Sequence, residues 1–134
     1  MKKVPKVLIV DDDKDLIEIT TLKLKKYNFQ VSSTQDPDAV LDILKKEDPD
    51  VILLDVKMPT TSGFDVAHQI EEHADKNHGK VIFFTSLGDE NPDVMENNRR
   101  FSRECGAVDY LKKNIDLDKL ANIIEEIAEK RDNA

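Results

Sequence analysis

Short apolar runs, rich in β-branched residues, alternate along this chain with longer segments that have helical spacing. The run Val51–Leu54 contains no polar residue, which is typical of a strand buried on both faces. Strands that alternate with helices form a parallel sheet covered by helices on both sides. The pattern therefore predicts an α/β fold with a doubly wound, five-stranded parallel sheet. The predicted strands are residues 6–10, 29–33, 51–54, 81–84 and 107–111.

Residues that start helices follow most of these runs. Asp13 and Asp116 are placed to cap the first and last helices, and Asp36 followed by Pro37 is a typical helix start. The segment before the last helix is only weakly helical and is preceded by a predicted loop at residues 88–93. The first predicted helix follows Asp13. The others span 37–46, 64–73, about 90–104 and 117 onward.

Length and charge restrict the class of protein. A chain of 134 residues is expected to form one domain, here residues 1–134 with a core of about 5–130. A net charge of −8 argues against direct nucleic-acid binding. The sequence has no apolar run of about 18 residues and no signal-peptide pattern, so we expect neither membrane insertion nor export. The single Cys105 fits a reducing cytoplasm.

Polar side chains follow the predicted strands at their carboxyl ends, where ligands bind in such sheets. Asp11 and Asp12 follow the first strand and Asp55 follows the third. Carboxylates a few Å apart repel by roughly 1–4 kcal/mol per pair, so the cluster holds either protons or a cation. Mg²⁺ is suited to such oxygen ligands, and Asp55 beside a cation could attack phosphorus. Thr85 and Lys113, after the fourth and fifth strands, would supply a hydroxyl and an ammonium.

Four segments resemble the motifs of receiver domains of two-component response regulators, in the same order and along essentially the whole chain. They are residues 10–13, 54–63, 84–86 and 106–113. The resemblance implies a flavodoxin-like (βα)5 fold with strand order 2-1-3-4-5. It also implies a signalling domain that assists its own phosphorylation and dephosphorylation, rather than an enzyme.

The resemblance further implies a phosphoryl acceptor and a metal site. Asp55 would accept a phosphoryl group from a histidine kinase or a histidine phosphotransfer protein. The ligands of Mg²⁺ or Mn²⁺ would be Asp11, Asp12, Asp55 and the backbone carbonyl of Lys57.

The remaining implied roles concern the signal. Thr85 and Lys113 would contact the phosphoryl group, and Tyr110 would be the switch aromatic that turns inward when Thr85 moves. A downstream protein would dock on the face formed by the helix near 90–104, the strand 107–111 and the last helix. We expect a monomer or a weak, phosphorylation-dependent dimer. A stand-alone receiver is expected, and the alternative is a receiver fragment of a larger regulator.

Arg99, Arg100 and Arg103 crowd one segment of this face. They form either a solvated helix face or a docking patch for an acidic partner.

Two features depart from the family pattern. Asn114 follows Lys113 where the family has a proline after a cis peptide bond. A cis bond costs about 0.5–1 kcal/mol before proline but about 2.5–4 kcal/mol elsewhere. We therefore expect a trans bond, or a strained cis one, with Lys113 less rigidly aimed. The segment between Thr85 and Tyr110 is longer than usual, with the excess near residues 87–93.

Three other functions compete with a receiver domain. A phosphohydrolase of the haloacid-dehalogenase kind needs a second aspartate where this chain has Lys57. A flavodoxin-like electron carrier would have its flavin phosphate repelled by residues 11–13. An unphosphorylated pseudo-receiver scaffold remains an alternative because of Asn114. The histidines His68, His73 and His78 fan out around a helix and are expected on the surface, not in a metal site.

Overall fold

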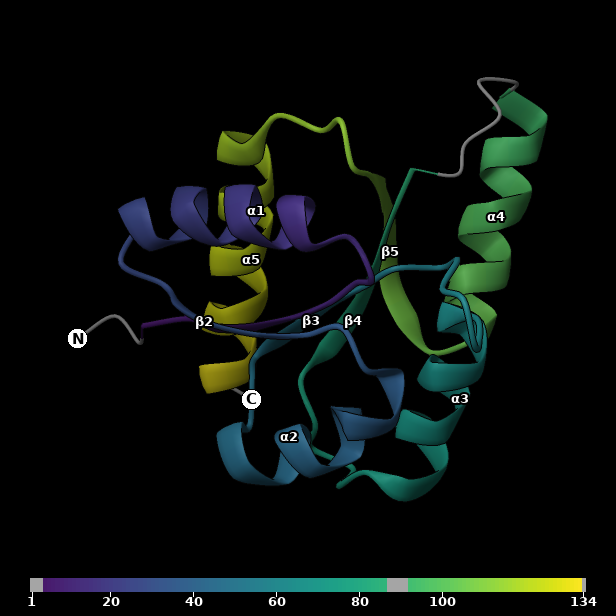
Figure 1. The fold of residues 1–134 in the computed structure, drawn as a ribbon, viewed down its shortest axis with the longest axis horizontal. Coiled ribbons are helices and arrows are strands. Elements are labelled where there is room, and N and C mark those ends of the chain that lie inside the picture. The colour runs from purple at the N-terminus through teal and green to yellow at the C-terminus, as the bar shows by residue number, and fades with distance from the viewer. Residues whose placement is uncertain (1–3, 87–91, 134) are drawn as a thin grey trace.

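The structure, a computed structural model, describes residues 4–86 and 92–133, with side chains from residue 97 onward in the second range. Its strands form one parallel sheet in the order β2-β1-β3-β4-β5, with helices between them (Figure 1). The predicted fold class and strand order are confirmed. The strands are β1 (Lys6–Val10), β2 (Gln30–Thr34), β3 (Val51–Leu54), β4 (Lys80–Thr85) and β5 (Ala107–Lys112). The helices are α1 (Lys14–Lys26), the 3-10 turn η1 (Pro37–Ala39), α2 (Val40–Glu47), α3 (Gly63–His73), α4 (Pro92–Glu104) and α5 (Leu117–Asp132).

Two apolar layers enclose the sheet, because successive residues of a strand point to opposite faces. On β3, Val51 and Leu53 pack with residues of α1 and α5, whereas Ile52 and Leu54 pack with residues of α2 and α3. All four of these side chains are fully buried. The uninterrupted apolar run in the sequence is thus explained by a central strand that is covered on both sides.

The helix starts follow the capping residues, with two corrections. Asp13 accepts backbone N–H bonds at the start of α1, and Asp116 caps α5, as predicted. Asp36 instead caps the short η1 turn, and α2 begins only at Val40. Ser62, which the sequence analysis did not single out, caps α3.

Strand and helix ends move by one or two residues from their predicted positions. β2 begins at Gln30 rather than Phe29, and β5 extends to Lys112. α4 begins at Pro92 rather than near residue 90. The predicted loop at 88–93 and the proposed excess at 87–93 fall largely outside the described residues.

The two ends of α5 are tied to the rest of the molecule. Near its first turn, Asp118 accepts a hydrogen bond from Tyr27, the residue after α1, and lies 3.2 Å from the ammonium of Lys23 in α1. Near its last turn, the guanidinium of Arg131 lies 2.8 Å from Asp50 Oδ1 and 2.7 Å from Asp48 Oδ1. Arg131 therefore ties α5 to the loop between α2 and β3.

Asp50 is a buried carboxylate whose charge this guanidinium balances. Its side chain is 0% exposed, and its second oxygen accepts the backbone N–H of Lys6 at 3.0 Å. Arg131 also donates to the carbonyl oxygen of Asn77 at 2.8 Å, so three chain segments meet at one side chain. Breaking this ion pair is costly, because the charge of Asp50 is desolvated.

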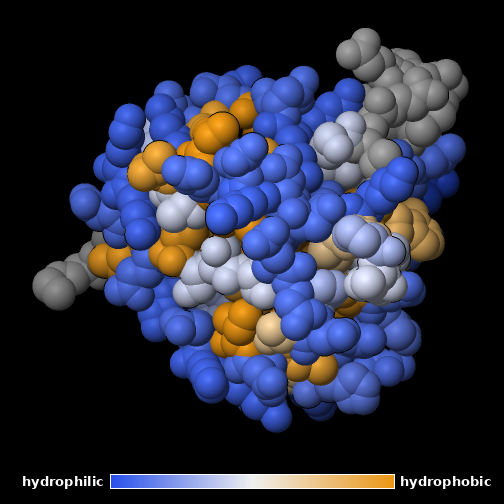
Figure 2. All heavy atoms as spheres, viewed as in Figure 1, coloured by the Kyte–Doolittle hydropathy of each residue, from blue (hydrophilic) through white to orange (hydrophobic). Residues whose placement is uncertain are grey.

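No described helix is both long enough and apolar enough to span a bilayer. On the face shown in Figure 2, apolar side chains gather over α1 and α2 within a largely hydrophilic surface. On α1, Ile19 and Leu22 are 61% and 60% exposed.

Removing the guanidinium should destabilise the fold strongly. We expect Arg131→Ala to lower the free energy of unfolding by about 3–5 kcal/mol, because Asp50 loses the guanidinium that balances its buried charge. The neighbouring Lys130, 76% exposed and paired only with an exposed Glu126, is the matched control. Lys130→Ala should cost less than about 1 kcal/mol in urea unfolding followed by far-UV circular dichroism. Equal losses in the two variants would contradict the role of the buried pair.

Candidate functional site

The carboxylates of Asp11, Asp12 and Asp55 converge at the carboxyl ends of β1 and β3. Each contributes an oxygen atom, and these atoms lie within 4.8 Å of one another. β1 and β3 are hydrogen-bonded neighbours, with Val10 opposite Leu54, so the residues that follow them are brought together. Asp11 and Asp55 are 1% and 4% exposed, whereas Asp12 faces solvent. The predicted grouping of the three acids is therefore what the structure has.

Lys113 reaches into this cluster from the turn after β5. Its Nζ lies 2.8 Å from Asp11 Oδ2 and 3.4 Å from Asp55 Oδ1. Its backbone N–H donates to the carbonyl of Thr85 at 2.9 Å, which anchors the start of the turn to β4. The side chain is 14% exposed, so the ammonium is mostly shielded from water.

The peptide bond between Lys113 and Asn114 is trans, since the described residues contain no cis peptide bond. A hydrogen bond of 3.0 Å from the Ile115 N–H to the Lys112 carbonyl closes a four-residue turn around it. Of the two expected geometries, trans or strained cis, the structure has the trans one. The ammonium of Lys113 nevertheless contacts both buried carboxylates.

Asp11 is held in place by the chain that follows it. Its Oδ1 accepts the backbone N–H of Asp13 at 2.8 Å, while Oδ2 faces Lys113. Both oxygens of Asp11 are thus engaged.

The loop after Asp55 approaches it so closely that one position has to be glycine. A Cβ atom on Gly63 would lie 2.1 Å from the backbone oxygen of Asp55. The same loop folds back through a bridge between Lys57 and Ser62, and the side chain of Lys57 is exposed. No pattern in the sequence singles out Gly63 for this close approach. Its contact with Asp55 depends on tertiary packing, for which the sequence gives no signal beyond the glycine itself.

Thr85 and Tyr110 lie on the same side of the sheet. Tyr110 pairs with Phe83 of β4, and Thr85 lies two residues beyond Phe83, so both side chains leave the sheet toward α3 and α4. Thr85 is fully buried and Tyr110 is 3% exposed, so the tyrosine is turned inward here. The ring hydroxyl has a hydrogen bond with Asn98 of α4.

Burial sets the electrostatics of the cluster. Desolvation, together with the charge of Asp11, raises the pKa of Asp55 from 3.8 to about 6, while Lys113 acts in the opposite direction. Burial by itself would lower the pKa of Lys113, but the hydrogen bond and charge of Asp11, with Asp55, outweigh it and raise that pKa. The three carboxylates share one ammonium, that of Lys113, so the cluster has an excess of negative charge. An added cation would balance this charge.

The donor set fits a hard divalent cation. It offers carboxylate oxygens on short loops, one of them solvent-facing, and Mg²⁺ is typically bound by one or two carboxylates together with water and phosphate. Within the described residues, no other group of three ligating side chains comes as close together.

Among the described residues, no histidine belongs to a group of side chains that could hold a metal ion. His68 and His73 are exposed and lie near Glu72, as expected for surface residues. The expectation was wrong for His78, whose side chain is only 14% exposed. It lies after α3, between the Gly79 carbonyl and Glu71, because the helix ends before it.

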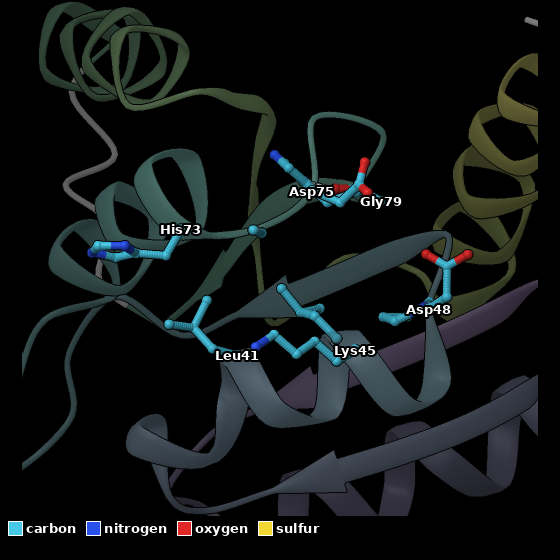
Figure 3. Close-up of a pocket in the computed structure, with 10 residues that line it drawn as sticks. Leu41, Lys45, Asp48, His73, Asp75 and Gly79 are labelled. Carbon is cyan, nitrogen blue, oxygen red and sulfur yellow. Dashed lines mark hydrogen bonds between the residues drawn. The ribbon is translucent and has the colours of Figure 1, made fainter.

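A pocket of about 410 Å³ lies between α2 and the connection from α3 to β4 (Figure 3). Leu41 and Lys45 of α2 face it from one side, and His73 and Asp75 from the other. Asp48 and Gly79, next to the amino ends of β3 and β4, also line it. The pocket is thus at the end of the sheet opposite the acidic cluster and shares no residue with it.

Comparison with known proteins identifies the family. The profile described as "Response regulator receiver domain" matches residues 7–125. The transcriptional regulatory protein YxdJ of Bacillus subtilis (strain 168) is 33% identical over 113 residues, which cover 84% of this chain and 45% of that protein. A probable cyclic di-GMP phosphodiesterase of Vibrio cholerae is 34% identical over 111 residues, 83% of this chain and 24% of that protein. The chain therefore spans less than half the length of these curated relatives.

Solved structures have the same fold. A CheY-like response regulator receiver domain protein from Methanospirillum hungatei JF-1 superposes with a TM-score of 0.82 at 22% identity, covering 98% of both chains. A putative response regulator from Chloroflexus aurantiacus J-10-fl has a TM-score of 0.79 at 26% identity, covering 95% of this chain and 99% of that one. With the family profile matching most of its length, this chain belongs to the response regulator receiver domains of two-component systems.

Proposed function

We propose that this chain accepts a phosphoryl group on Asp55 from a histidine kinase or a histidine phosphotransfer protein. The observation that carries the proposal is the contact of Lys113 with two buried carboxylates at the switch point of the sheet. A carboxylate oxygen of Asp55 would attack the phosphorus atom, the phosphorus–nitrogen bond of the donor would break, and the released histidine would take up a proton from water. Asp11, whose two oxygens are both engaged, is the poorer nucleophile.

Mg²⁺ would be held by Asp11, Asp12, Asp55 and the backbone carbonyl of Lys57, with Mn²⁺ as a substitute. When bound, the ion neutralises carboxylate charge and the charge of the incoming phosphoryl oxygens. The ammonium of Lys113 would pass from Asp55 to the phosphoryl group.

The signal would pass through Thr85 and Tyr110. An acyl phosphate adds a group of about −1.5 to −2 charge with three strong acceptor oxygens, to which the Thr85 hydroxyl can donate. The burial of both side chains on one face of the sheet supports this coupling.

The proposed output face is formed by α4, β5 and α5, and the proposed donor surface is α1. Val108 of β5 is 44% exposed, and Arg99 and Arg100 of α4 are exposed. Ile19 and Leu22, exposed on the helix that follows the acidic residues, are assigned to the phosphoryl donor.

We further propose one receiver domain with its core at about 5–130, monomeric or weakly dimerising on phosphorylation, without direct nucleic-acid binding. The curated relatives are longer than the part that this chain matches, so domains of this kind also occur within larger regulators.

The pseudo-receiver scaffold is the second candidate, favoured only by Asn114. The trans bond before Asn114 does not keep Lys113 from Asp11 and Asp55, so it gives the scaffold little support.

Without a divalent cation, Asp55 should make the fold pH-sensitive. An acid whose pKa is raised on folding binds its proton more tightly when folded, so its contribution is complete below the unfolded pKa of 3.8 and is lost as the pH rises through about 6. In EDTA, the wild type should therefore lose at most about 3 kcal/mol relative to Asp55→Asn between these pH values. Urea unfolding at each pH measures the difference. Asp13→Asn, which keeps the helix cap, should follow the wild type. Parallel pH profiles for the wild type and Asp55→Asn would contradict the raised pKa.

Phosphorylation is tested by intact mass after incubation with acetyl phosphate, with and without Mg²⁺. We expect a gain of one phosphoryl group, about 80 Da, that requires both Mg²⁺ and Asp55 and is absent in Asp55→Ala. Asp12→Asn should need a higher Mg²⁺ concentration, whereas the neighbouring Asp13→Asn should behave as the wild type. No gain under any condition would favour the scaffold instead.

A further inference from the structure

Gln35, the residue after β2, reaches across to the loop that carries the first two acids of the cluster. Its side-chain Nε2 donates to the backbone carbonyl of Asp12 at 3.1 Å. β1 and β2 are parallel neighbours with Val10 opposite Thr34, so the segments that follow the two strands lie next to each other. The contact therefore joins the end of β2 to the loop between β1 and α1.

We infer that Gln35 is a positioning residue of the metal site, which fixes the peptide of Asp12 and thereby aims the Asp12 carboxylate at the cation. The inference rests on the proposed function, because it assigns a further residue to the same Mg²⁺ site. Gln35 would act through Asp12 and not on the ion itself.

Asp12 is the acid of the cluster that burial constrains least. Asp11 is buried, with one oxygen bonded to the Asp13 N–H at 2.8 Å and the other 2.8 Å from the ammonium of Lys113. Asp55 is also buried and lies 3.4 Å from the same ammonium. Asp12 instead faces solvent. The direction of its carboxylate therefore depends more on the orientation of its own backbone.

The peptide between Asp12 and Asp13 is held at both of its polar groups. Its N–H donates to Asp11 Oδ1 at 2.8 Å, and its carbonyl accepts the amide of Gln35. Because a peptide group is planar, the two hydrogen bonds together restrict the rotation of the whole plane. Loss of the Gln35 amide would release the carbonyl side of this plane, directly beside the Asp12 side chain.

The turn that carries Gln35 is ordered by local hydrogen bonds. The Thr34 hydroxyl accepts the Asp36 N–H at 3.0 Å, and Asp36 Oδ1 accepts the Asp38 N–H at 2.9 Å, where it caps η1. The Thr34 carbonyl also accepts the Asp11 N–H at 3.2 Å. Although the Gln35 side chain is exposed, its backbone is thus already fixed, so less entropy is lost when its amide bonds to Asp12.

The orientation of Asp12 matters because Mg²⁺ requires nearly ideal octahedral geometry. Residues that orient metal ligands change the affinity for the metal without touching it. A single net hydrogen bond changes an equilibrium constant by about fivefold. We therefore expect weaker Mg²⁺ binding without the Gln35 amide, not the loss of binding.

Mg²⁺ affinity is measured by following the backbone amide resonances of isotope-labelled protein during a Mg²⁺ titration. Gln35→Met keeps the length of the side chain but removes the amide, and it should raise the Mg²⁺ dissociation constant about fivefold. Gln30→Met is the matched control, because Gln30 is exposed at the other end of β2, where it pairs with Lys6. Equal dissociation constants for the two variants would overturn the inference.

The same titration with Ca²⁺ separates positioning from a general weakening of the site. Ca²⁺ accepts more ligands and a more flexible geometry than Mg²⁺. Its dissociation constant should therefore change by less than about twofold in Gln35→Met. An equal loss of affinity for both ions would contradict a positioning role.

The contact itself is tested without metal. In metal-free buffer, Gln35→Met should increase the exchange rate of the Asp13 amide proton about fivefold, whereas Gln30→Met should leave it unchanged. Equal exchange in the two variants would overturn the role of Gln35. A wild type whose amide resonances do not respond to Mg²⁺ would instead contradict the proposed metal site, and the exchange comparison would still decide whether Gln35 holds the loop.

Discussion

β3 is a fully apolar strand with a buried carboxylate at each end, and the two carboxylates are neutralised in different ways. At the amino end, Asp50 is paired with Arg131, which is also bonded to Asp48 and to a backbone carbonyl of the neighbouring loop. At the carboxyl end, Asp55 lies 3.4 Å from the ammonium of Lys113, which it shares with Asp11. A buried charge is stable only when it is paired, so both ends need a cation. The first is fixed by several hydrogen bonds, and the second is left under-neutralised and open to exchange.

The under-neutralised end explains why the site is suited to metal and phosphoryl chemistry. Two of its three acids are buried and next to each other because β1 and β3 pair directly. Burial, together with the charge of Asp11, raises the pKa of Asp55 to about 6, which would weaken it as a nucleophile at low pH. A bound divalent ion would remove that handicap and would balance the charge of an incoming phosphoryl group. The same arrangement that destabilises the metal-free site therefore selects for a cation.

The sequence could predict most of this because the relevant signals are local. The run Val51–Leu54, the cap at Asp13 and the acids at strand ends each follow from a short stretch of residues. Strand order could not be read from periodicity and came from the family resemblance. Three features were missed because they depend on distant packing: the close approach of Gly63 to Asp55, the pairing of Arg131 with Asp50 and the contact of Asn98 with Tyr110. His78 was misplaced because a helical projection was continued past the end of α3.

The two anchors of α5 have a mechanical consequence for the surface it shares with α4 and β5. One end of α5 is bonded to α1 through Asp118, and the other to the base of the sheet through Arg131. α4 instead packs on α3 through the edge-on contact of the Phe101 and Phe64 rings. The α5 side of this surface is thus tied by ion pairs, and ring packing holds the α4 side. A partner that spans both sides would detect any displacement of α4 as a change in the distance between α4 and α5.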